Sequence, residues 1–505
     1  NRYICSKKQL ISGKQTHKMN SQLAKLEPAP VWRLFDAICA IPHPSGHETR
    51  LAAALAALAE KNGLAVRLDV TGNLRIDRPA SPGFEDSPMI LLQGHLDMVP
   101  QALATVDFDF TREPIPLTVE DGWVRSAAGT TLGSDDGIGV AAAMALLLDP
   151  ELKCGPLAGV FTVSEEVGLN GALALSAEFL KGDFLLNLDS EEEGQLYIGC
   201  AGGARLEIDV ELPQAAVPPG YTGLCCEIKN LAGGHSGVDI HLRRGNAVAF
   251  LARLLEKMPE FEVAALSGGT LDNVIPREAV AFGAADPARL ATLRLRAANL
   301  ALEFAREFDA PPDFAVELRP AVLPERVWER SFREKLVALL ATCPNGVRSM
   351  DRALDVVRTS TNLAAVKTDG TQLKIRTSQR SLVDAERQKL TDEIAAHFAP
   401  AGGRPTVDNS YPGWEPDPES ELLRTAESLY RELFGTPPQV KVIHAGLECG
   451  ILAGINPALR MISFGPTLIH PHSPSEKLNI ASVGRFYEFL RKLVLQLQIP
   501  SKPDK

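Results

Sequence analysis

Two side chains that can bind a metal ion, His95 and Asp97, follow an apolar run at residues 89–92. The run is typical of a buried parallel strand, and positions two apart in an extended chain point to the same face. At the carboxyl edge of a sheet, that face is where ligands and metals usually sit. His95 would offer a metal one ring nitrogen while Asp97 orients the other through a hydrogen bond. A His-x-Asp pair alone is more often structural, so the rest of the chain must decide between the two interpretations.

Adjacent carboxylates occur at two further points of the chain. Asp135 and Asp136 lie in a glycine-flanked turn just before an expected alanine- and leucine-rich helix. A helix N-cap accounts for one of them, and a carboxylate in the same place can also bridge two cations. Glu165 and Glu166 follow an expected buried strand, where neighbouring negative charges are unfavourable unless cations or protons are present. On a solvated helix start, the same pair would carry no such meaning.

A third strand, expected at 184–188, ends in Asp189. Three strands thus end in histidine or acidic side chains, and the carboxyl ends of parallel strands meet at one edge of a sheet. Carboxylates and imidazole without thiolates suit a catalytic zinc site, with manganese and cobalt as alternatives. The sequence therefore predicts a metal site at this edge.

The segments around these residues predict an α/β protein. Ser45 and Glu48 form a capping-box pattern ahead of leucines at positions 51, 55 and 58, which predicts an amphipathic helix. Strands expected near 64–70 and 74–77 then lead to His95. A helix expected at 480–497 closes the fold.

The alternation of apolar and polar residues changes near residue 205 and predicts an antiparallel sheet with helices on one side. A proline-rich stretch at 411–418 marks a second boundary. We therefore predict a mixed-sheet catalytic domain made of two segments, 19–205 and 410–505, with an α+β lid domain inserted at 206–409. Residues 1–18 lack clear periodicity and are interpreted as an upstream extension.

The composition limits the class of protein. A chain of 505 residues favours two or more domains, and its net charge of −11 argues against a nucleic-acid partner. Eight cysteines without a C-x-x-C motif are typical of reduced thiols in the cytosol. We find neither an apolar run long enough to cross a bilayer nor a signal-peptide pattern. We expect a cytoplasmic protein with a small soluble substrate and no membrane partner.

Taken together, the motifs resemble those of the co-catalytic di-zinc exopeptidases, a family that includes aminoacylases, tripeptidase T and carnosinases. The resemblance runs from Val31 to Leu497. It rests on motifs in a fixed order: His95-Leu-Asp97, Gly133-Ser-Asp-Asp-Gly137, Glu165-Glu166, Asp189 and Pro471-His-Ser-Pro474. Two longer stretches look most like the branch of the family that cleaves aminoacyl-histidine dipeptides: His95-Leu-Asp-Met-Val-Pro-Gln101 and His444-Ala-Gly-Leu-Glu-Cys-Gly450.

The resemblance implies two divalent metal ions, zinc first and cobalt or manganese as alternatives. Asp135 would bridge the two ions. The ligands that would complete the two sites come in pairs: His95 with Asp189, and Glu166 with His472. Asp97 would support His95, and Glu165 would act as general base and acid.

In the inserted region, the resemblance implies three substrate-binding residues. His235, within Gly233-Gly-His-Ser-Gly237, would polarise the scissile carbonyl, although a turn histidine flanked by glycines is the simpler interpretation of that motif alone. Asn273 and Arg380 would hold the carboxylate of the substrate, because a guanidinium fork matches that group. His470 competes with His472 for the ligand position, but only His472 fits the Pro-His-Ser-Pro pattern.

The expected function is metal-dependent hydrolysis of dipeptides, especially those with a C-terminal histidine, carnosine included; a homodimer is an open expectation. The alternative is an N-acyl amino acid amidohydrolase, or a broader di- or tripeptidase, on the same scaffold. A non-catalytic binding protein of this fold would lack a ligand or Glu165, and none is missing. A di-metal phosphoesterase fits the carboxylates alone but not the order of the motifs.

Overall fold

The structure is a computed structural model that describes residues 19–498, so the extension expected at 1–18 lies outside the described residues. The chain divides into two compact units. Unit 1 comprises residues 19–199, 416–441 and 451–498, and unit 2 comprises residues 200–415 and 442–450. Residues 442–450 thus count with unit 2, whereas the sequence analysis placed all of 410–505 in the catalytic segment. The backbone explains the difference, because the amide of Ala201 donates to the carbonyls of Ile443 and Ala445.

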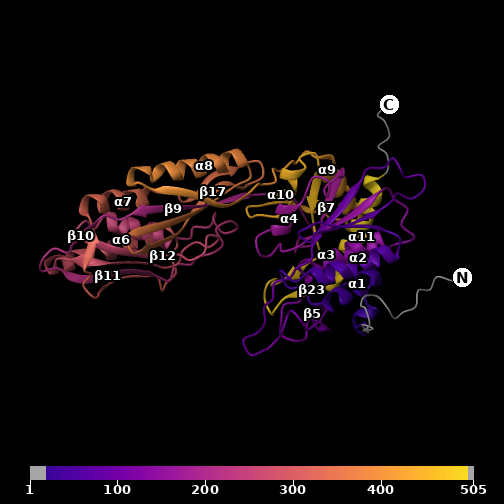
Figure 1. Cartoon of the computed structure of the whole chain (residues 1–505), viewed down its shortest axis with the longest axis horizontal. Coiled ribbons are helices and arrows are strands. Elements are labelled where there is room, and N and C mark those ends of the chain that lie inside the picture. The colour runs from indigo at the N-terminus through magenta and orange to yellow at the C-terminus, as the bar shows by residue number, and fades with distance from the viewer. Residues whose placement is uncertain (1–18, 499–505) are drawn as a thin grey trace. The chain divides into compact units, whose positions relative to one another are not determined.

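The main sheet of unit 1 has eight strands in the described part of the chain. In the order in which they pair, they are β1 (Ala65–Leu68), β2 (Leu74–Arg78), β6 (Leu157–Thr162), β3 (Ile90–His95), β7 (Phe184–Asn187), β21 (Arg460–Ser463), β8 (Gln195–Cys200) and β20 (Gln439–Ile443). The four central strands, from β6 to β21, run parallel. Figure 1 shows the yellow C-terminal segments among the indigo and magenta ones, as the pairing of β21 with β7 requires. The carboxyl ends of the central strands therefore meet at one edge, as predicted.

Helices flank this sheet. They are α1 (Ala29–Cys39), α2 (Thr49–Lys61), α3 (Ser134–Leu147), α4 (Asn170–Ala174), α9 (Glu421–Phe434) and α11 (Ile480–Leu497), with the short η1 (Leu23–Lys25), while α10 (Glu448–Ile455) spans the boundary between the units. Helix α3 packs on β3 and β6 and is covered in turn by α1. It is buried almost all round, which its run of alanine and glycine permits because short side chains allow close approach. The helix that carries Asp135 is thus fixed on both sides.

A small sheet in unit 1 holds the loop with the Pro471-His-Ser-Pro474 motif. Its strands pair in the order β22 (Leu468–Ile469), β23 (Lys477–Asn479), β5 (Trp123–Ser126) and β4 (Leu117–Glu120). Strands β22 and β23 form an antiparallel hairpin whose loop contains His470 and His472. Pairing of β23 with β5 anchors this loop to the N-terminal half of the chain.

Unit 2 is built on a nine-stranded sheet. Eight of its strands pair in the order β14 (Ala315–Pro320), β11 (Thr222–Lys229), β13 (Ala279–Ala285), β12 (Glu262–Gly268), β17 (Val356–Asp369), β18 (Gln372–Ser381), β9 (Gly202–Glu211) and β19 (Arg404–Tyr411), and β16 (Gly346–Asp351) pairs with β17. Strands β10 (Gln214–Ala216) and β15 (Arg326–Trp328) form a separate pair.

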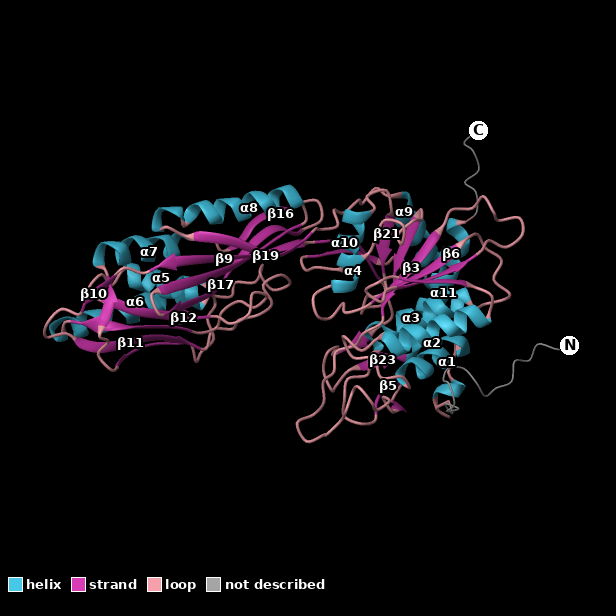
Figure 2. Ribbon diagram, viewed as in Figure 1, coloured by secondary structure: helices cyan, strands magenta, loops and turns pink. Residues whose placement is uncertain are grey.

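One face of this sheet carries the core of unit 2. Alternate residues such as Leu206, Ile208 and Val210 of β9 are buried against the helices, as the period of a half-covered strand requires. The helices are α5 (Ala247–Glu256), α6 (Leu290–Glu307), α7 (Arg330–Thr342) and α8 (Asp384–His397), with the short η2 (Pro287–Arg289) and η3 (Ala399–Ala401). Figure 2 shows α7 and α8 lying along the strands of this unit.

The predicted fold class is confirmed: a parallel-centred α/β unit is interrupted in sequence by an α+β unit with an antiparallel sheet. Among the described residues, none of the helices combines the length and the apolar character that a membrane span needs.

Candidate metal centre

His95 is the last residue of β3 and is 1% exposed. Its Nδ1 lies 3.1 Å from the carbonyl oxygen of Asp97 and 3.5 Å from Asp97 Oδ1. Its Nε2 lies 3.2 Å from Asp135 Oδ1 and 3.4 Å from Asp189 Oδ1. Burial lowers the pKa of His95, but the carboxylates of Asp189, Asp135 and Asp97 outweigh it and raise that pKa well above its usual value. One ring nitrogen is therefore oriented by Asp97 and the other faces two carboxylates.

Asp135 and Asp136 point in different directions from the first turn of α3, where both have non-helical backbone angles. Burial alone raises the pKa of Asp135, but hydrogen bonds with His472 and His95 lower it well below the usual value. Asp136 is 2% exposed and turns into the fold, where a Cβ atom at Gly94 or Gly139 would overlap its carboxylate. Burial and the charge of Asp189 raise the pKa of Asp136 well above its usual value.

Asp97 also holds the segment that carries the glutamate pair. Its Oδ1 accepts a hydrogen bond from the amide of Glu165 at 2.9 Å, and its Oδ2 accepts one from the amide of Glu166 at 3.2 Å. The hydroxyl of Ser45 donates to the same Oδ2 at 2.8 Å. One carboxylate thus fixes the imidazole of His95 and the backbone of both glutamates.

His472 enters the site from the β22–β23 loop. Its Nε2 lies 3.0 Å from Asp135 Oδ2 and 3.0 Å from Glu166 Oε1. These two carboxylates, Asp135 first, raise the pKa of His472 to about 11. The side chain of His472 is 49% exposed, so the site is open to solvent on this side. The competing candidate, His470, instead uses its carbonyl oxygen to accept a hydrogen bond from the hydroxyl of Ser473.

The capping box predicted at Ser45 and Glu48 is wrong. Ser45 donates to Asp97, and Glu48 Oε1 accepts hydrogen bonds from Gly46 N and from the amide and hydroxyl of Ser164. Helix α2 starts at Thr49 without a side-chain cap. The prediction failed because the hydroxyl of Ser45 and the carboxylate of Glu48 bind Asp97 and Ser164, which lie just after strands, and not the first turn of α2.

A chain of buried polar side chains lies across the strands that carry the ligands. Asn187 of β7 donates to Gln93 Oε1 of β3 at 2.6 Å. The hydroxyls of Ser190 and Ser463, from the end of β7 and from β21, lie 2.7 Å apart. These residues were not predicted from the sequence. Their contacts depend on which strands are neighbours, and the strand order is not known from the sequence.

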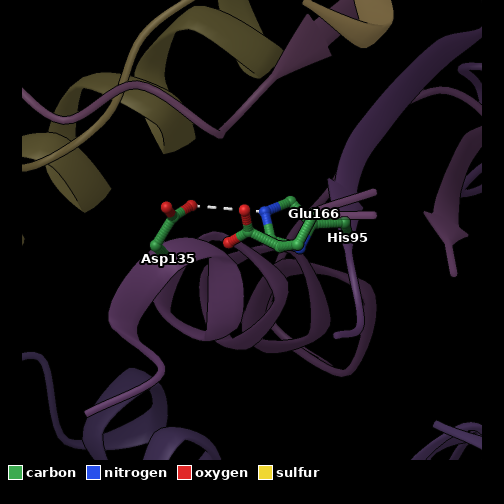
Figure 3. A group of neighbouring side chains, drawn as sticks. All are labelled: His95, Asp135 and Glu166. Atoms are coloured by element: carbon green, nitrogen blue, oxygen red, sulfur yellow. Dashed lines mark hydrogen bonds and ion pairs between the residues drawn. The ribbon is translucent and has the colours of Figure 1, made fainter. Parts of the chain in front are cut away.

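The donor set suits divalent cations. Ligand atoms of His95, Asp135 and Glu166 lie within 4.8 Å of one another, and Figure 3 shows the three side chains converging above the start of α3. Asp189 and His472 add a third carboxylate and a second imidazole at hydrogen-bonding range. Glu166 Oε1 is buried and receives no hydrogen bond of acceptable geometry from the described residues. Three carboxylates against two imidazoles leave an excess of negative charge that bound cations would offset.

Unit 2 has its own cluster around the predicted substrate-binding residues. A Cβ atom at Gly237 would overlap the carbonyl of His444 and press on the side chains of His235 and Arg380, so these groups pack around one glycine. Arg380 is 7% exposed, and its Nη1 donates to the hydroxyl of Tyr411 at 3.0 Å. His444 Nε2 lies 2.7 Å from the hydroxyl of Ser360.

Asn273 lies beside this cluster on an exposed turn. Its carbonyl oxygen accepts a hydrogen bond from the amide of Ser236 at 2.8 Å, next to His235. Asn273 therefore supports the His235 loop through its backbone.

The chain is similar to known peptidases over most of its length. Residues 91–496 match the family described as Peptidase family M20/M25/M40. The chain is 38% identical over 487 residues to the cytosol non-specific dipeptidase of Escherichia coli (strain K12), covering 95% of this chain and all of that protein. The crystal structure of the aminoacylhistidine dipeptidase from Vibrio alginolyticus matches with a TM-score of 0.87 and 38% identity, over 96% of this chain and 99% of that one.

A more distant structure shows the same fold. The aminopeptidase PepT from Bacillus cereus ATCC 10987 matches with a TM-score of 0.56 at 16% identity, over 94% of this chain and 99% of that one. With the family model covering most of the chain, the resemblance inferred from the motifs is confirmed. The chain belongs to Peptidase family M20/M25/M40, a family of hydrolases that act on peptide bonds.

Proposed function

We propose that this protein hydrolyses the peptide bond of dipeptides, those with a C-terminal histidine included, in a reaction that depends on two zinc ions and uses Glu165 as general base. The observation that carries the proposal is the convergence of His95, Asp135, Glu166 and His472, with Asp189 beside them, at one edge of the sheet. Both relatives at 38% identity are named as dipeptidases, one non-specific and one for aminoacyl-histidine. Dipeptides are the substrate class that the two names share.

In this proposal, Asp135 bridges the two ions, His95 and Asp189 complete one site, and Glu166 and His472 complete the other. Two bound cations would lower the pKa of a shared water and polarise the scissile carbonyl. Cobalt and manganese remain the alternatives to zinc, because oxygen and imidazole ligands suit all three.

We assign Glu165 as the base because its neighbour, Glu166, belongs to the proposed ligand group. Glu166 Oε1 lies 3.0 Å from His472 Nε2, so the side chain of Glu166 belongs to the ligand group. Asp97 holds the backbone amides of both glutamates and so places Glu165 beside that group. From there, a carboxylate can take a proton from water and deliver it to the leaving amine.

His235 is suited to donate a hydrogen bond to a carbonyl. Its Nδ1 accepts from the amides of Gly237 at 3.2 Å and Val238 at 3.0 Å, which leaves the ring proton on Nε2. Burial and the charge of Arg380 lower the pKa of His235, so the ring is neutral at neutral pH. We propose that this Nε2–H polarises the carbonyl of the substrate.

Arg380 and Asn273 remain our proposed partners for the substrate carboxylate. Arg380 Nε is buried without a hydrogen-bond partner among the described residues, and a carboxylate would supply one. The side chain of Asn273 is exposed near the same loop. A cytosolic site of action also stays a proposal.

The test uses purified zinc-loaded protein and a panel of Xaa-His dipeptides, other dipeptides, tripeptides and N-acetyl amino acids. We expect the dipeptides to be cleaved, and we expect Glu165→Gln to keep both zinc ions while kcat falls by roughly 10²–10⁴-fold. The matched control is Glu178→Gln, an exposed glutamate that pairs with Arg67. Wild-type turnover in Glu165→Gln would remove Glu165 as the base, and cleavage of N-acetyl amino acids alone would favour the amidohydrolase.

A further inference from the structure

Glu476 is a buried carboxylate that lies outside the ligand group. It is 3% exposed and stands four residues after His472, at the end of the β22–β23 loop. Its own amide donates to the carbonyl of Ser473 at 3.0 Å, which closes the turn directly after His472. A buried carboxylate is costly unless hydrogen bonds compensate for the lost water, so its partners explain why it is there.

All four hydrogen bonds to this carboxylate come from one short segment more than 340 positions earlier in the chain. Glu476 Oε2 accepts from the amides of Leu132 at 2.8 Å and Gly133 at 3.2 Å. Glu476 Oε1 accepts from the amide of Ser134 at 2.8 Å and from its hydroxyl at 2.6 Å. The next residue is Asp135. The Glu476 carboxylate is therefore hydrogen-bonded to the backbone directly before the proposed bridging aspartate.

The backbone conformation and the packing of Gly133 also restrain the segment 132–134. Gly133 has a φ of 73°, a left-handed conformation that favours glycine. A Cβ atom at Gly133 would also lie 2.9 Å from the sulfur of Met98. The turn therefore lies close to Met98 and is hydrogen-bonded to Glu476.

We propose that Glu476 is a positioning residue for the metal centre, which sets the separation of Asp135 and His472 by tying the loops that carry them. This inference rests on the proposed function. His472 Nε2 and Asp135 Oδ2 lie 3.0 Å apart although one comes from a hairpin and the other from a helix start. Metal sites need their ligands held to within about 0.5 Å, and four hydrogen bonds to one rigid carboxylate supply such a constraint.

The test compares zinc affinity in wild type and in Glu476→Gln, measured on metal-stripped protein by competition with a chelating dye. The amide NH2 of glutamine would face either the pair of backbone amides or the Ser134 amide, so at least one hydrogen bond becomes a donor–donor contact. We expect the zinc affinity to fall about 10- to 100-fold. Activity should return as zinc is raised to saturation, because the catalytic groups themselves are unchanged.

Glu329→Gln is the matched control. Glu329 caps α7 in unit 2 through the same kind of contacts, accepting from the amides of Ser331 and Phe332 and from the hydroxyl of Ser331. Both glutamine variants should lower the thermal stability of the protein, but only Glu476→Gln should change zinc affinity. Equal zinc affinity in wild type and Glu476→Gln would overturn the positioning role.

A second variant covers the case in which Glu476→Gln does not fold. Ser134→Ala removes the hydroxyl donor and keeps the three backbone bonds, so we expect a smaller loss of zinc affinity, below about tenfold. An unchanged affinity in a folded Ser134→Ala would count against the inference. Failure of the wild type to bind zinc, cobalt or manganese would instead overturn the proposed function, so the two failures are distinguishable.

Discussion

Nε2 of His472 lies 3.0 Å from Oδ2 of Asp135, although 337 positions separate the two residues in the chain. The pairing of β23 with β5 brings the C-terminal hairpin beside the N-terminal segments of unit 1. The last ligand of the proposed metal centre therefore depends on tertiary structure that only the complete unit provides.

Replacing His472 and His470 in turn should show which histidine of the hairpin binds zinc. We expect His472→Ala to weaken zinc binding by at least about a hundredfold, since losing even a group that merely supports a ligand costs 10- to 100-fold. His470→Ala, two residues away on the same loop, should leave zinc affinity unchanged. Zinc titration of both variants checks this, and the reverse ranking would move the ligand assignment to His470.

Removal of the metal should affect stability as well as turnover. Without cations, the largely buried carboxylates of Asp135, Asp189 and Glu166 have, among the described residues, only the imidazoles of His95 and His472 to offset their charge. Zinc present at a thousand times its dissociation constant would stabilise the folded protein by about 4 kcal/mol. We expect chelation to abolish activity and to lower the Tm of unit 1, and added zinc, cobalt or manganese to restore both.

Calorimetry and turnover measured on the same samples check this expectation. The Tm of unit 2 is the internal control, because the proposed ligands all belong to unit 1. Full activity in protein shown to be free of metal would contradict the mechanism.

The positions of the proposed strand-end ligands could be predicted because they follow from local rules. His95 is the last residue of β3, and Glu166 and Asp189 lie a few residues after β6 and β7. The carboxyl ends of these parallel strands meet at one edge of the sheet. The place of Asp135 just before a helix was also readable from the glycine-flanked turn. Spacing and hydrophobic pattern were sufficient to place these residues at one edge of the sheet, whereas their individual roles followed from the family resemblance and stay predictions.

The supporting residues could not be predicted, for a physical reason. Ser45 and Glu48 match a capping box, and only the fold decides that their partners are Asp97 and Ser164. Glu476 lies in a short polar loop without periodicity, and the neighbouring residues give no sign in the sequence that its side chain is buried. A hydrogen bond to a distant backbone amide leaves no trace in local sequence, whereas a strand or helix does.

Arg380 offers a test of substrate recognition in unit 2. We expect Arg380→Met to raise KM for dipeptides roughly 10- to 100-fold with a smaller effect on kcat, because a hydrogen bond to a charged group contributes about 1.5–3 kcal/mol. The same variant should lose the preference for a free carboxylate over a C-terminal amide. Arg376→Met on the same strand is the control, since that arginine pairs with Glu207. Equal KM values in wild type and Arg380→Met would remove Arg380 from the substrate site.

His444 makes the stability of unit 2 depend on pH. Burial, followed by the charge of Arg380, lowers the pKa of His444 to about 3, and the charges of His235 and His241 act in the same direction. An unfolded histidine has a pKa of about 6.5, so between pH 6.5 and 3 the unfolded chain binds the proton and the folded unit does not. The free energy of unfolding therefore falls as the pH falls through this window, by about 1.4 kcal/mol per pH unit.

The measurement is urea unfolding of wild type and His444→Gln at pH 7.5 and 4.5. Because the variant has no imidazole to protonate at position 444, we expect wild type to lose about 3 kcal/mol more than the variant between the two values. His241→Gln, at an exposed position in the same unit, should behave like wild type. A neutral ring at position 444 leaves Arg380 as the adjacent positive charge, which is the condition under which the guanidinium can attract a carboxylate. An NMR titration that found the His444 pKa near 6.5 would contradict both the stability argument and this electrostatic account.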